Sequence, residues 1–405
     1  MTSTATGAYR ADIGDTGRSL GVSDDQWVTI ASLLEQATFS PEEDRSALID
    51  AAVALARASL RDAARHGHTH SEWGSPEQGS CETLLILADQ MFEAAALHLA
   101  RVVLDAFLNA APDLSVLEQG RLIARRARID ARLGALAEAA DQYTTVGRLG
   151  HRTRNPELRI RAWIGHAVLA QMHGNYPEQM RYCRRAARVA DRHELRSLSR
   201  LAHTGLMITA GARHEFDDAL RHGREAYRQS LGDPIAEAEI LEGIGQLLLE
   251  AGQAAIAADV LASVLRRTLP VRIILPTLGS LAIAEARRGD SASVHWAVAE
   301  LRRLSGTTRI ASYVYASALL DCASALSVLD ELEPAMRILD EAVLIAEAHG
   351  YHEIVVKADE VRRVRARLEA VPPPRPVLHQ GWVTELAEQE SERLPRHVCV
   401  LSAAE

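Results

Sequence analysis

The clearest pattern of hydrophobic and polar positions lies in residues 241–264, LEGIGQLLLEAGQAAIAADVLASV. Apolar residues recur there every three or four positions on both sides of Gly252, which predicts two amphipathic helices. Glycine is favoured where a helix ends in a left-handed conformation, so Gly252 marks the turn between the two helices. The small residues Gly245 and Ala257 would allow an antiparallel pair to approach closely. One such pair cannot bury its own apolar face, and the pattern therefore predicts neighbouring pairs.

The same pattern recurs along most of the chain. A residue early in the second helix of each pair serves as a reference position, at Ala100, Ala139, Gln179, Ala219, Ala257, Val294 and Ala335. The reference positions follow one another at intervals of 37 to 41 residues. The turns before them contain Gly134, Gly174, His214, Gly252, Gly289 and Asp330. A fixed period of this length is the signature of a helical solenoid. We therefore predict an all-α fold, an α-solenoid of about seven antiparallel helix pairs.

Two copies of the pattern resemble the tetratricopeptide repeat, whose motif has a small residue in helix one, Gly at the turn, Ala in helix two and a closing Pro. The matching residues are Leu87, Ala88, Met91, Ala100, Leu104, Phe107 and Pro112 in one copy, and Ile244, Gly245, Leu248, Gly252, Ala257 and Leu261 in another. Other copies depart from the motif, because Gln179 and Val294 replace the small residue of helix two and most closing prolines are missing or displaced. The resemblance covers residues 80–370, and the period of about 40 residues resembles a longer variant found in sensor domains of bacterial transcription regulators. It implies a right-handed superhelix.

Composition divides the chain into four parts. Residues 1–23 are rich in Thr, Ser, Gly and Asp without periodicity, which predicts a disordered N-terminus. Residues 24–79 are expected to form an N-terminal helical pair and a turn-rich loop, and residues 80–370 the TPR-like solenoid. Residues 371–405 begin with the Pro-rich stretch VPPPRP, which predicts an extended linker. A short amphipathic helix over 381–393 should follow, and would cap the array, occupy its groove or bind elsewhere.

Composition also narrows the compartment and the classes of partner. The 405 residues are 47% hydrophobic but only 4% aromatic, so alanine and leucine must form the core. The four cysteines are far apart in the sequence, which indicates thiols of a reducing compartment. We find neither a signal-peptide pattern nor an apolar run of the ~18 residues that a membrane span requires. The net charge of −9 argues against nucleic-acid binding by the whole chain. These features predict a cytoplasmic protein without a membrane partner.

Charge is unevenly distributed. Residues 121–228 hold 21 Arg and 11 Asp plus Glu, a net charge of +10, which leaves −19 for the rest of the chain. The first helix of each repeat lines the concave face of a solenoid, and the candidates there for binding carboxylates or phosphates of a partner are Arg121, Arg128, Arg132 and Arg161. The alternative is a solvated helix face with local ion pairs.

The later repeats are more acidic. In the same register, the side chains expected on the concave face are Glu239, Glu242, Gln246 and Glu250. A groove that is basic at one end and acidic at the other would orient an extended peptide or a partner helix.

Motifs for catalysis are weak or incomplete. Residues 17–21, GRSLG, match the nucleophile elbow of hydrolases, but no strand pattern precedes them. Lys357 is the single lysine, and its context EIVVKADE excludes a phosphate-binding loop. The alternating histidines His66, His68 and His70 are weak candidates for a metal site, with a solvated loop as the alternative. We therefore predict that the protein is not an enzyme and needs no cofactor.

The predicted function is a non-catalytic scaffold or adaptor that binds a protein or peptide on the concave face of the solenoid. An alternative, which the resemblance implies, is a regulatory sensor that responds to a small molecule or a peptide and controls a partner protein, such as a transcription regulator. A metal protein or enzyme built around the histidine triplet is the third hypothesis.

Overall fold

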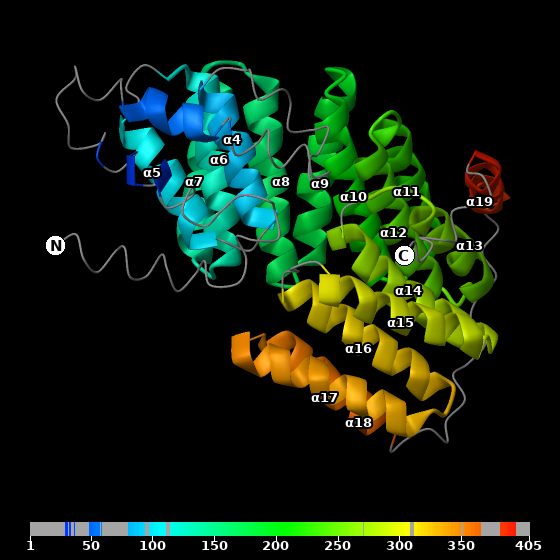
Figure 1. Cartoon of the computed structure of the whole chain (residues 1–405). Coiled ribbons are helices and arrows are strands. Elements are labelled where there is room, and N and C mark those ends of the chain that lie inside the picture. Colours follow the sequence, from blue (N-terminus) through cyan, green and yellow to red (C-terminus); the bar gives the residue numbers. More distant parts are fainter. Residues whose placement is uncertain are drawn as a thin grey trace. The chain divides into compact units, whose positions relative to one another are not determined.

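The structure is a computed structural model, and every regular element among the residues that it describes is a helix (Figure 1). It describes residues 80–93, 97–110, 114–269, 271–307, 312–349, 351–365 and 381–393, together with 29–30, 32–33, 36, 48–56 and 58. The N-terminal residues 1–23 and the histidine triplet lie outside the described residues.

From α4 to α18 the helices follow one another at short intervals along the chain. They are α4 (Ser80–Glu93), α5 (Leu97–Ala110), α6 (Val116–Arg132), α7 (Leu136–Arg152), α8 (Pro156–Met172), α9 (Tyr176–Arg192), α10 (Arg196–Ala212), α11 (Phe216–Ser230), α12 (Pro234–Glu250), α13 (Ala254–Leu265), α14 (Val271–Arg288), α15 (Ser291–Thr307), α16 (Ser312–Val328), α17 (Leu332–His349), α18 (His352–Arg365) and α19 (Gly381–Arg393). The even-numbered helices from α4 to α16 are called first helices below, and the helix that follows each of them is its second helix. Successive first helices begin about 40 residues apart, as the sequence period predicted.

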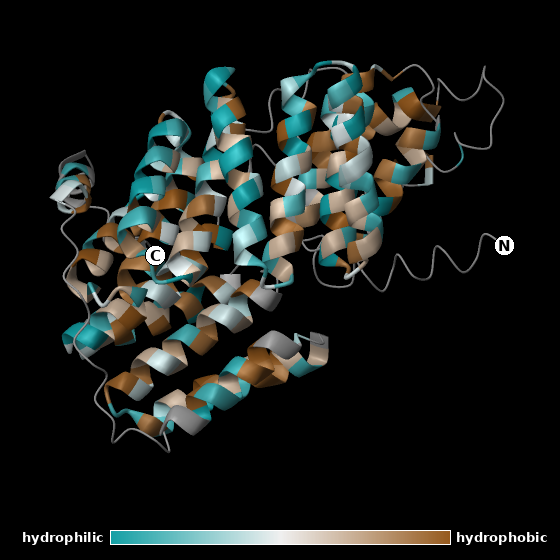
Figure 2. Ribbon diagram, turned by 180° about the vertical axis from the view of Figure 1, so that it is seen from behind, coloured by the Kyte–Doolittle hydropathy of each residue, from teal (hydrophilic) through white to brown (hydrophobic). Residues whose placement is uncertain are grey.

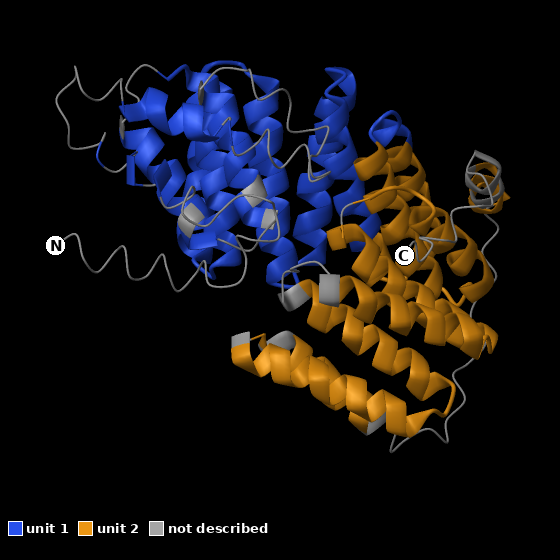
Figure 3. Cartoon of the chain, in the orientation of Figure 1, with its two compact units in different colours: residues 1–209, 228–233 blue, residues 210–227, 234–405 orange. Residues whose placement is uncertain are grey.

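The chain forms two compact units (Figure 3). Unit 1 comprises residues 1–209 and 228–233, and unit 2 comprises residues 210–227 and 234–405, so that α10 and α11 are each divided between the units. In each unit, consecutive helices pack as antiparallel pairs, such as α8 with α9 and α16 with α17. First helices also contact one another in series, α4–α6–α8 in unit 1 and α12–α14–α16 in unit 2, and α18 continues the second series by contacting α16. The predicted all-α solenoid of helix pairs is confirmed.

Each unit buries its own apolar residues. Alanine and leucine dominate these cores, for example in the cluster that α14 to α18 form in unit 2. Figure 2 shows hydrophobic and hydrophilic residues alternating along individual helices, as expected of amphipathic helices that place one face in a core. All seven reference positions of the repeat are at most 2% exposed, including Gln179, whose Nε2 donates a hydrogen bond to Gln171 Oε1 at 3.1 Å. The repeat pattern therefore identified core positions correctly.

Small residues set the distance between paired helices. A Cβ atom on Gly245 of α12 would lie only 2.5 Å from Leu261 Cδ2 of α13, so a larger residue would force the pair apart. Ala257 of α13 is fully buried. The close approach predicted at Gly245 is thus present, and it depends on the absence of a side chain there.

The turns share one backbone conformation, a residue in the left-handed region. Every turn predicted between paired helices contains a residue with positive φ, from 61° at His214 to 85° at Gly134. The turns between successive pairs use it too, at Arg154, Glu194 and Gly232. At Glu194 the backbone N–H bonds to Asp191 O at 3.2 Å, and the next N–H bonds to Ala190 O at 3.0 Å, which is the Schellman pattern that ends a helix.

The C-terminal helix α19 packs against α13, a second helix. Val383 and Leu386 of α19 are buried, and the guanidinium carbon of Arg224 lies 5.6 Å from the centre of the Trp382 ring. Of the placements expected for this helix, the structure thus shows one on a second helix rather than along the row of first helices.

The left-handed turn conformation leads to a stability prediction. Glu194 has φ of 54°, where an L side chain is strained, so Glu194→Gly should stabilise unit 1 by about 0.5–1 kcal/mol. The matched control is Gly174→Ala, at a turn with φ of 68° and open space around its Cα, which should destabilise by about 1 kcal/mol. Urea unfolding followed by circular dichroism measures both, and equal losses in the two variants would contradict the prediction.

Candidate ligand-binding site

Polar side chains converge on the row of first helices in unit 2. Gln246 Nε2 of α12 lies 3.5 Å from Ser280 Oγ of α14. Beside Ser280, a Cβ atom on Gly279 would lie 2.9 Å from Asp321 Cβ and 3.0 Å from Asp321 Oδ2 of α16. Glu242, on the same helix as Gln246, accepts a hydrogen bond from the Gln246 amide. Three successive repeats therefore contribute to one polar site, which we call the inner acidic site (Glu242, Gln246, Ser280 and Asp321).

The local sequence of α14 makes room for this site. Pro276 lies inside the helix, where proline has no N–H to donate to the carbonyl one turn earlier. The hydroxyl of the next residue, Thr277, is satisfied within the helix, since its Oγ1 donates to Ile273 O at 2.7 Å. Gly279 follows, and any side chain at this position would collide with Asp321. The helix thus presents bare backbone and one hydroxyl between two carboxylates.

Burial dominates the electrostatics of the two carboxyl groups. Desolvation raises the pKa of Asp321 to about 7, and the charge of Lys357 only partly opposes this shift. Desolvation also raises the pKa of Glu242 to about 7, with further contributions from the negative charges of Asp321 and Glu239. Asp321 has no hydrogen bond and no ion pair with any residue that the structure describes. Two partly buried carboxyl groups thus lie near each other, and neither is ion-paired with a residue that the structure describes.

The nearest cations do not neutralise the site. Arg272 of α14 forms an ion pair with Glu239 at 2.8 Å. Lys357 of α18 is exposed, and its influence reaches Asp321 as a charge, not as a hydrogen bond. The inner acidic site is therefore rich in hydrogen-bond acceptors and deficient in positive charge, which suits an ammonium or guanidinium group.

Sequence reasoning found part of this site. Glu239, Glu242 and Gln246 come together on one side of α12, as their register predicted. Glu250, at the end of α12, is exposed and lies instead near Gly211, with its Oε2 4.0 Å from the position that a Cβ atom would take there. Asp321 was missed, although a single acid in the apolar run ALLDCASAL of α16 is a usable signal, because a buried carboxylate is costly.

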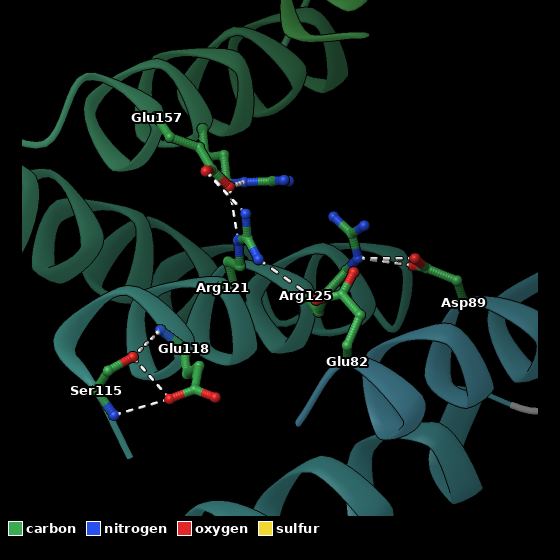
Figure 4. A network of polar contacts seen from close by, with 8 residues as sticks. Glu82, Asp89, Ser115, Glu118, Arg121, Arg125 and Glu157 are labelled. Atoms are coloured by element: carbon green, nitrogen blue, oxygen red, sulfur yellow. Dashed lines mark hydrogen bonds and ion pairs between the residues drawn. The ribbon is translucent and has the colours of Figure 1, made fainter. Parts of the chain in front are cut away.

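The predicted arginines of unit 1 lie on α6 and α8. Figure 4 shows Arg121 between Glu157 and Glu82. Arg121 donates from Nε and Nη2 to the two Glu157 carboxylate oxygens, at 2.7 and 2.9 Å, and its Nη1 lies 3.3 Å from Glu82 Oε2. Arg161 Nε also donates to Glu157, at 2.9 Å. Burial alone would raise the pKa of Glu157, but its hydrogen bonds to Arg121 and Arg161 lower it below the usual value. Arg121 and Arg161 are thus brought together by a shared carboxylate.

The other two predicted arginines differ from each other. Arg128 lies 3.8 Å from an Asp89 oxygen, and its guanidinium carbon is 3.9 Å from the centre of the Phe92 ring. Arg132 is exposed at the end of α6. Acids of neighbouring first helices therefore neutralise most of the predicted basic face, which is the ion-paired alternative that the sequence left open. A partner-binding role for these arginines stays a prediction.

The start of α6 fixes the position of Arg121. Ser115 caps this helix, because its Oγ accepts the Glu118 N–H at 3.3 Å while its own N–H donates to Glu118 Oε2 at 2.9 Å (Figure 4). Such a reciprocal capping box gives hydrogen-bond acceptors to two backbone N–H groups that would otherwise lack them. Hydrogen bonds from Ser115 lower the pKa of Glu118, so the cap holds at neutral pH.

Two other expectations concern metals and membranes. In the part of the chain that the structure describes, no three His, Cys, Asp or Glu side chains converge as ligands of a metal ion would. The candidates His66, His68 and His70 lie outside that part. Over the same residues, no helix combines the length and the apolar character that crossing a bilayer demands.

Comparison with known proteins gives no family match and no match among curated proteins. Among solved structures, the chain is similar to a signal transduction ATPase with numerous domains (STAND) that has a tetratricopeptide repeat sensor, from Pyrococcus horikoshii. The identity is 9% and the TM-score 0.49, over 90% of this chain and 55% of that one, so this chain spans about half its length.

Two further structures are similar. A tetratricopeptide repeat protein from Parabacteroides merdae is 17% identical, with a TM-score of 0.38 over 76% of this chain and 99% of that one. A circular tandem repeat protein with novel repeat topology is 16% identical, with a TM-score of 0.20 over 91% and 98% of the two chains. The chain resembles tetratricopeptide repeat proteins, as its motif predicted, and at these identities the likeness concerns the fold alone.

The raised pKa of Asp321 leads to a prediction about stability and pH. Its folded-state pKa of about 7 exceeds the ordinary value of 3.8, so the folded state binds more protons between these values and loses stability as the pH rises through this window. Asp321→Asn removes the penalty. It should raise the free energy of unfolding at pH 8 by about 1–3 kcal/mol, and the melting temperature by about 2–4 °C per kcal/mol.

Calorimetry at pH 5 and pH 8 measures this effect. At pH 5 the gain from Asp321→Asn should be smaller than at pH 8, since only the first part of the window between 3.8 and about 7 has then been crossed. Asp259→Asn, at an exposed position of α13, serves as the control and should change neither value. A melting temperature that Asp321→Asn lowers equally at both pH values would show that the carboxyl group supports the fold.

Proposed function

We propose that this chain is a non-catalytic binding module that recognises a basic side chain of a protein or peptide partner at the inner acidic site of unit 2. The observation that supports the proposal is the pair of carboxyl groups, Glu242 and Asp321, which desolvation penalises and no described cation neutralises. Ionisable groups held at a cost to stability cluster at functional sites. A bound cation would remove the cost by pairing with both groups.

The chemistry of the site favours arginine among basic side chains. The two carboxyl groups come from α12 and α16, with Gly279 and Ser280 of α14 between them. A guanidinium group has five N–H donors in a planar fork, so it can reach acceptors on separate helices at once. The Ser280 hydroxyl and the Gln246 carbonyl oxygen are further acceptors. An ammonium group has only three donors around one atom and fits a more compact site.

A partner segment would lie across several repeats. Because first helices of unit 2 contact one another in series, a peptide that enters the inner acidic site also meets side chains of the neighbouring repeats. Glu239 and Arg272 form one such neighbouring pair, at the α12–α14 contact. Extended surfaces of this kind are how helical repeat arrays bind polypeptides.

We place the protein in the cytoplasm, since the three cysteines within the described residues are free, buried thiols.

A regulatory sensor is the second candidate, and one observation favours it. The inner acidic site joins α12, α14 and α16, so a ligand held there would connect three repeats and resist changes in their spacing. Binding could thereby alter the curvature of unit 2, and the effect would reach a partner protein through that change. A peptide or a small molecule with a guanidinium group would serve as the effector.

Calorimetric titration with synthetic peptides tests the binding proposal. The probe is a labelled nonapeptide with a central arginine between glycine and alanine residues, and the comparison peptide has glutamine in its place. The native chain should bind the arginine peptide, and a double variant, Glu242→Gln with Asp321→Asn, should bind it at least tenfold more weakly, since each lost charged hydrogen bond is worth about 1.5–3 kcal/mol. Glu347→Gln, at an exposed position of α17, is the control. Equal affinity for the two peptides would overturn the proposal.

The same titration has a predictable pH dependence. Only the ionised carboxylates attract a cation, and both groups have a pKa of about 7, so the affinity should increase between pH 6 and pH 8. Binding at pH 7 should also release protons, which makes the measured enthalpy depend on the ionisation enthalpy of the buffer. A pH-independent affinity in the native chain would show that these two groups do not contact the arginine.

A further inference from the structure

A second charged surface lies in unit 1, on the second helix α9. Its arginines Arg181, Arg184, Arg185, Arg188 and Arg192 are all exposed. The spacing of three or four residues places them along one side of the helix over about 16 Å. The opposite side of α9 is buried and consists of small residues such as Cys183 and Ala186. This surface is separate from the first helices that carry the inner acidic site.

These arginines differ from those of α6 in their partners. Arg121 and Arg125 of α6 each form ion pairs with acids of neighbouring helices, at 2.7–2.8 Å. On α9, Arg181 pairs with Glu178 at 2.8 Å, but Arg184, Arg185, Arg188 and Arg192 form no ion pair with any described residue. Most arginines of α9 are therefore not neutralised within the described part of the chain, unlike those of α6.

Trp163 of α8 holds two guanidinium groups beside this row. The guanidinium carbon of Arg159 lies 5.2 Å from the centre of the Trp163 ring, and that of Arg185 lies 5.5 Å from it. The face of an indole ring attracts cations, which orients both side chains. Neither guanidinium has a carboxylate partner among the described residues, so two like charges share one ring without an anion. An external carboxylate would relieve their repulsion and accept hydrogen bonds from both.

We propose that Arg159 and Arg185, oriented by Trp163, together with Arg188 and Arg192, form a binding site for an acidic segment of a partner protein. The spacing of the arginines matches a partner helix with Asp or Glu at every third or fourth position, because carboxylates then recur along one side at the same pitch. Bidentate guanidinium–carboxylate pairs would fix the register. This site is independent of the function proposed for unit 2.

An acidic polypeptide fits this surface better than a nucleic acid does. Proteins that bind single strands combine positive charge with free aromatic faces on which bases stack. Here the Trp163 ring already faces two guanidinium groups. The Tyr182 ring stacks on His166 with ring centres 5.4 Å apart, and the guanidinium carbon of Arg181 is 5.1 Å from it. Neither ring is open to a base, whereas the guanidinium groups can still bind carboxylates.

Fluorescence anisotropy on the full chain tests the proposal. The probes are a labelled 16-residue alanine-based peptide with glutamate at every fourth position, its glutamine counterpart, and a 16-nucleotide single strand of thymidine. The native chain should bind the glutamate peptide and not the glutamine peptide, more weakly as salt increases. The double variant Arg185→Gln with Arg188→Gln should bind it at least tenfold more weakly. Both substitutions are at exposed positions, and circular dichroism checks that the variant remains folded.

Two controls separate this site from the others. Arg337→Gln, at an exposed position of α17 in unit 2, should leave the affinity unchanged. The double variant of the inner acidic site, Glu242→Gln with Asp321→Asn, should also bind the glutamate peptide normally, so failure of one proposal does not affect the other. Unchanged affinity in the Arg185/Arg188 variant would overturn the inference. Tighter binding of the thymidine strand than of the glutamate peptide would also overturn it, in favour of nucleic acid.

Discussion

Close packing between successive first helices is the constraint on which the rest of the structure depends. Alanine and glycine let these helices approach until backbone and side chains of adjacent repeats touch, as Gly279 and Asp321 do. An ionisable group on such a face loses much of its hydration, so it must form an ion pair or shift its pKa in favour of the neutral form. The chain has two solutions to this constraint. In unit 1, Glu157 holds two arginines, whereas in unit 2 Asp321 keeps its proton up to about neutral pH.

The second solution carries a potential for binding that the first lacks. An ion pair between neighbouring repeats, such as Arg121 with Glu157, satisfies both groups and leaves a partner little to gain. A desolvated carboxyl group without a paired cation is instead stabilised when a cationic group of a partner binds to it. The same contrast applies to the arginines of unit 1, where most arginines of α6 are ion-paired and, among the described residues, most of those of α9 are not. Both binding proposals therefore rest on the state of pairing of the charged groups, not on their number.

The fold could be predicted from the sequence because its determinants are local and repeated. From α6 onward each helix pair has a positive-φ turn, and every copy has a buried reference position in its second helix, so the period identified the core positions even at Gln179. The candidate site was harder to predict from the sequence, since the pairing of charged side chains depends on which helices lie side by side. Glu82, about one repeat before Arg121, meets it only because α4 and α6 are adjacent. Asp321 itself stands out in an apolar run, but its approach to Gly279 depends on the packing of α14 against α16, which the sequence does not specify locally.

Equal helix lengths have a consequence for how such a surface can change. Four consecutive helices of unit 1, from α6 to α9, each have 17 residues, and the turn after each of them contains a residue in the left-handed conformation. In unit 2, Glu242 and Gly279 each stand ninth in their helix and Asp321 stands tenth. Residues at this position along each helix thus form one row that crosses the repeats. One residue of this row can be substituted without changing the others, so each repeat contributes one independently variable residue to the specificity of the surface.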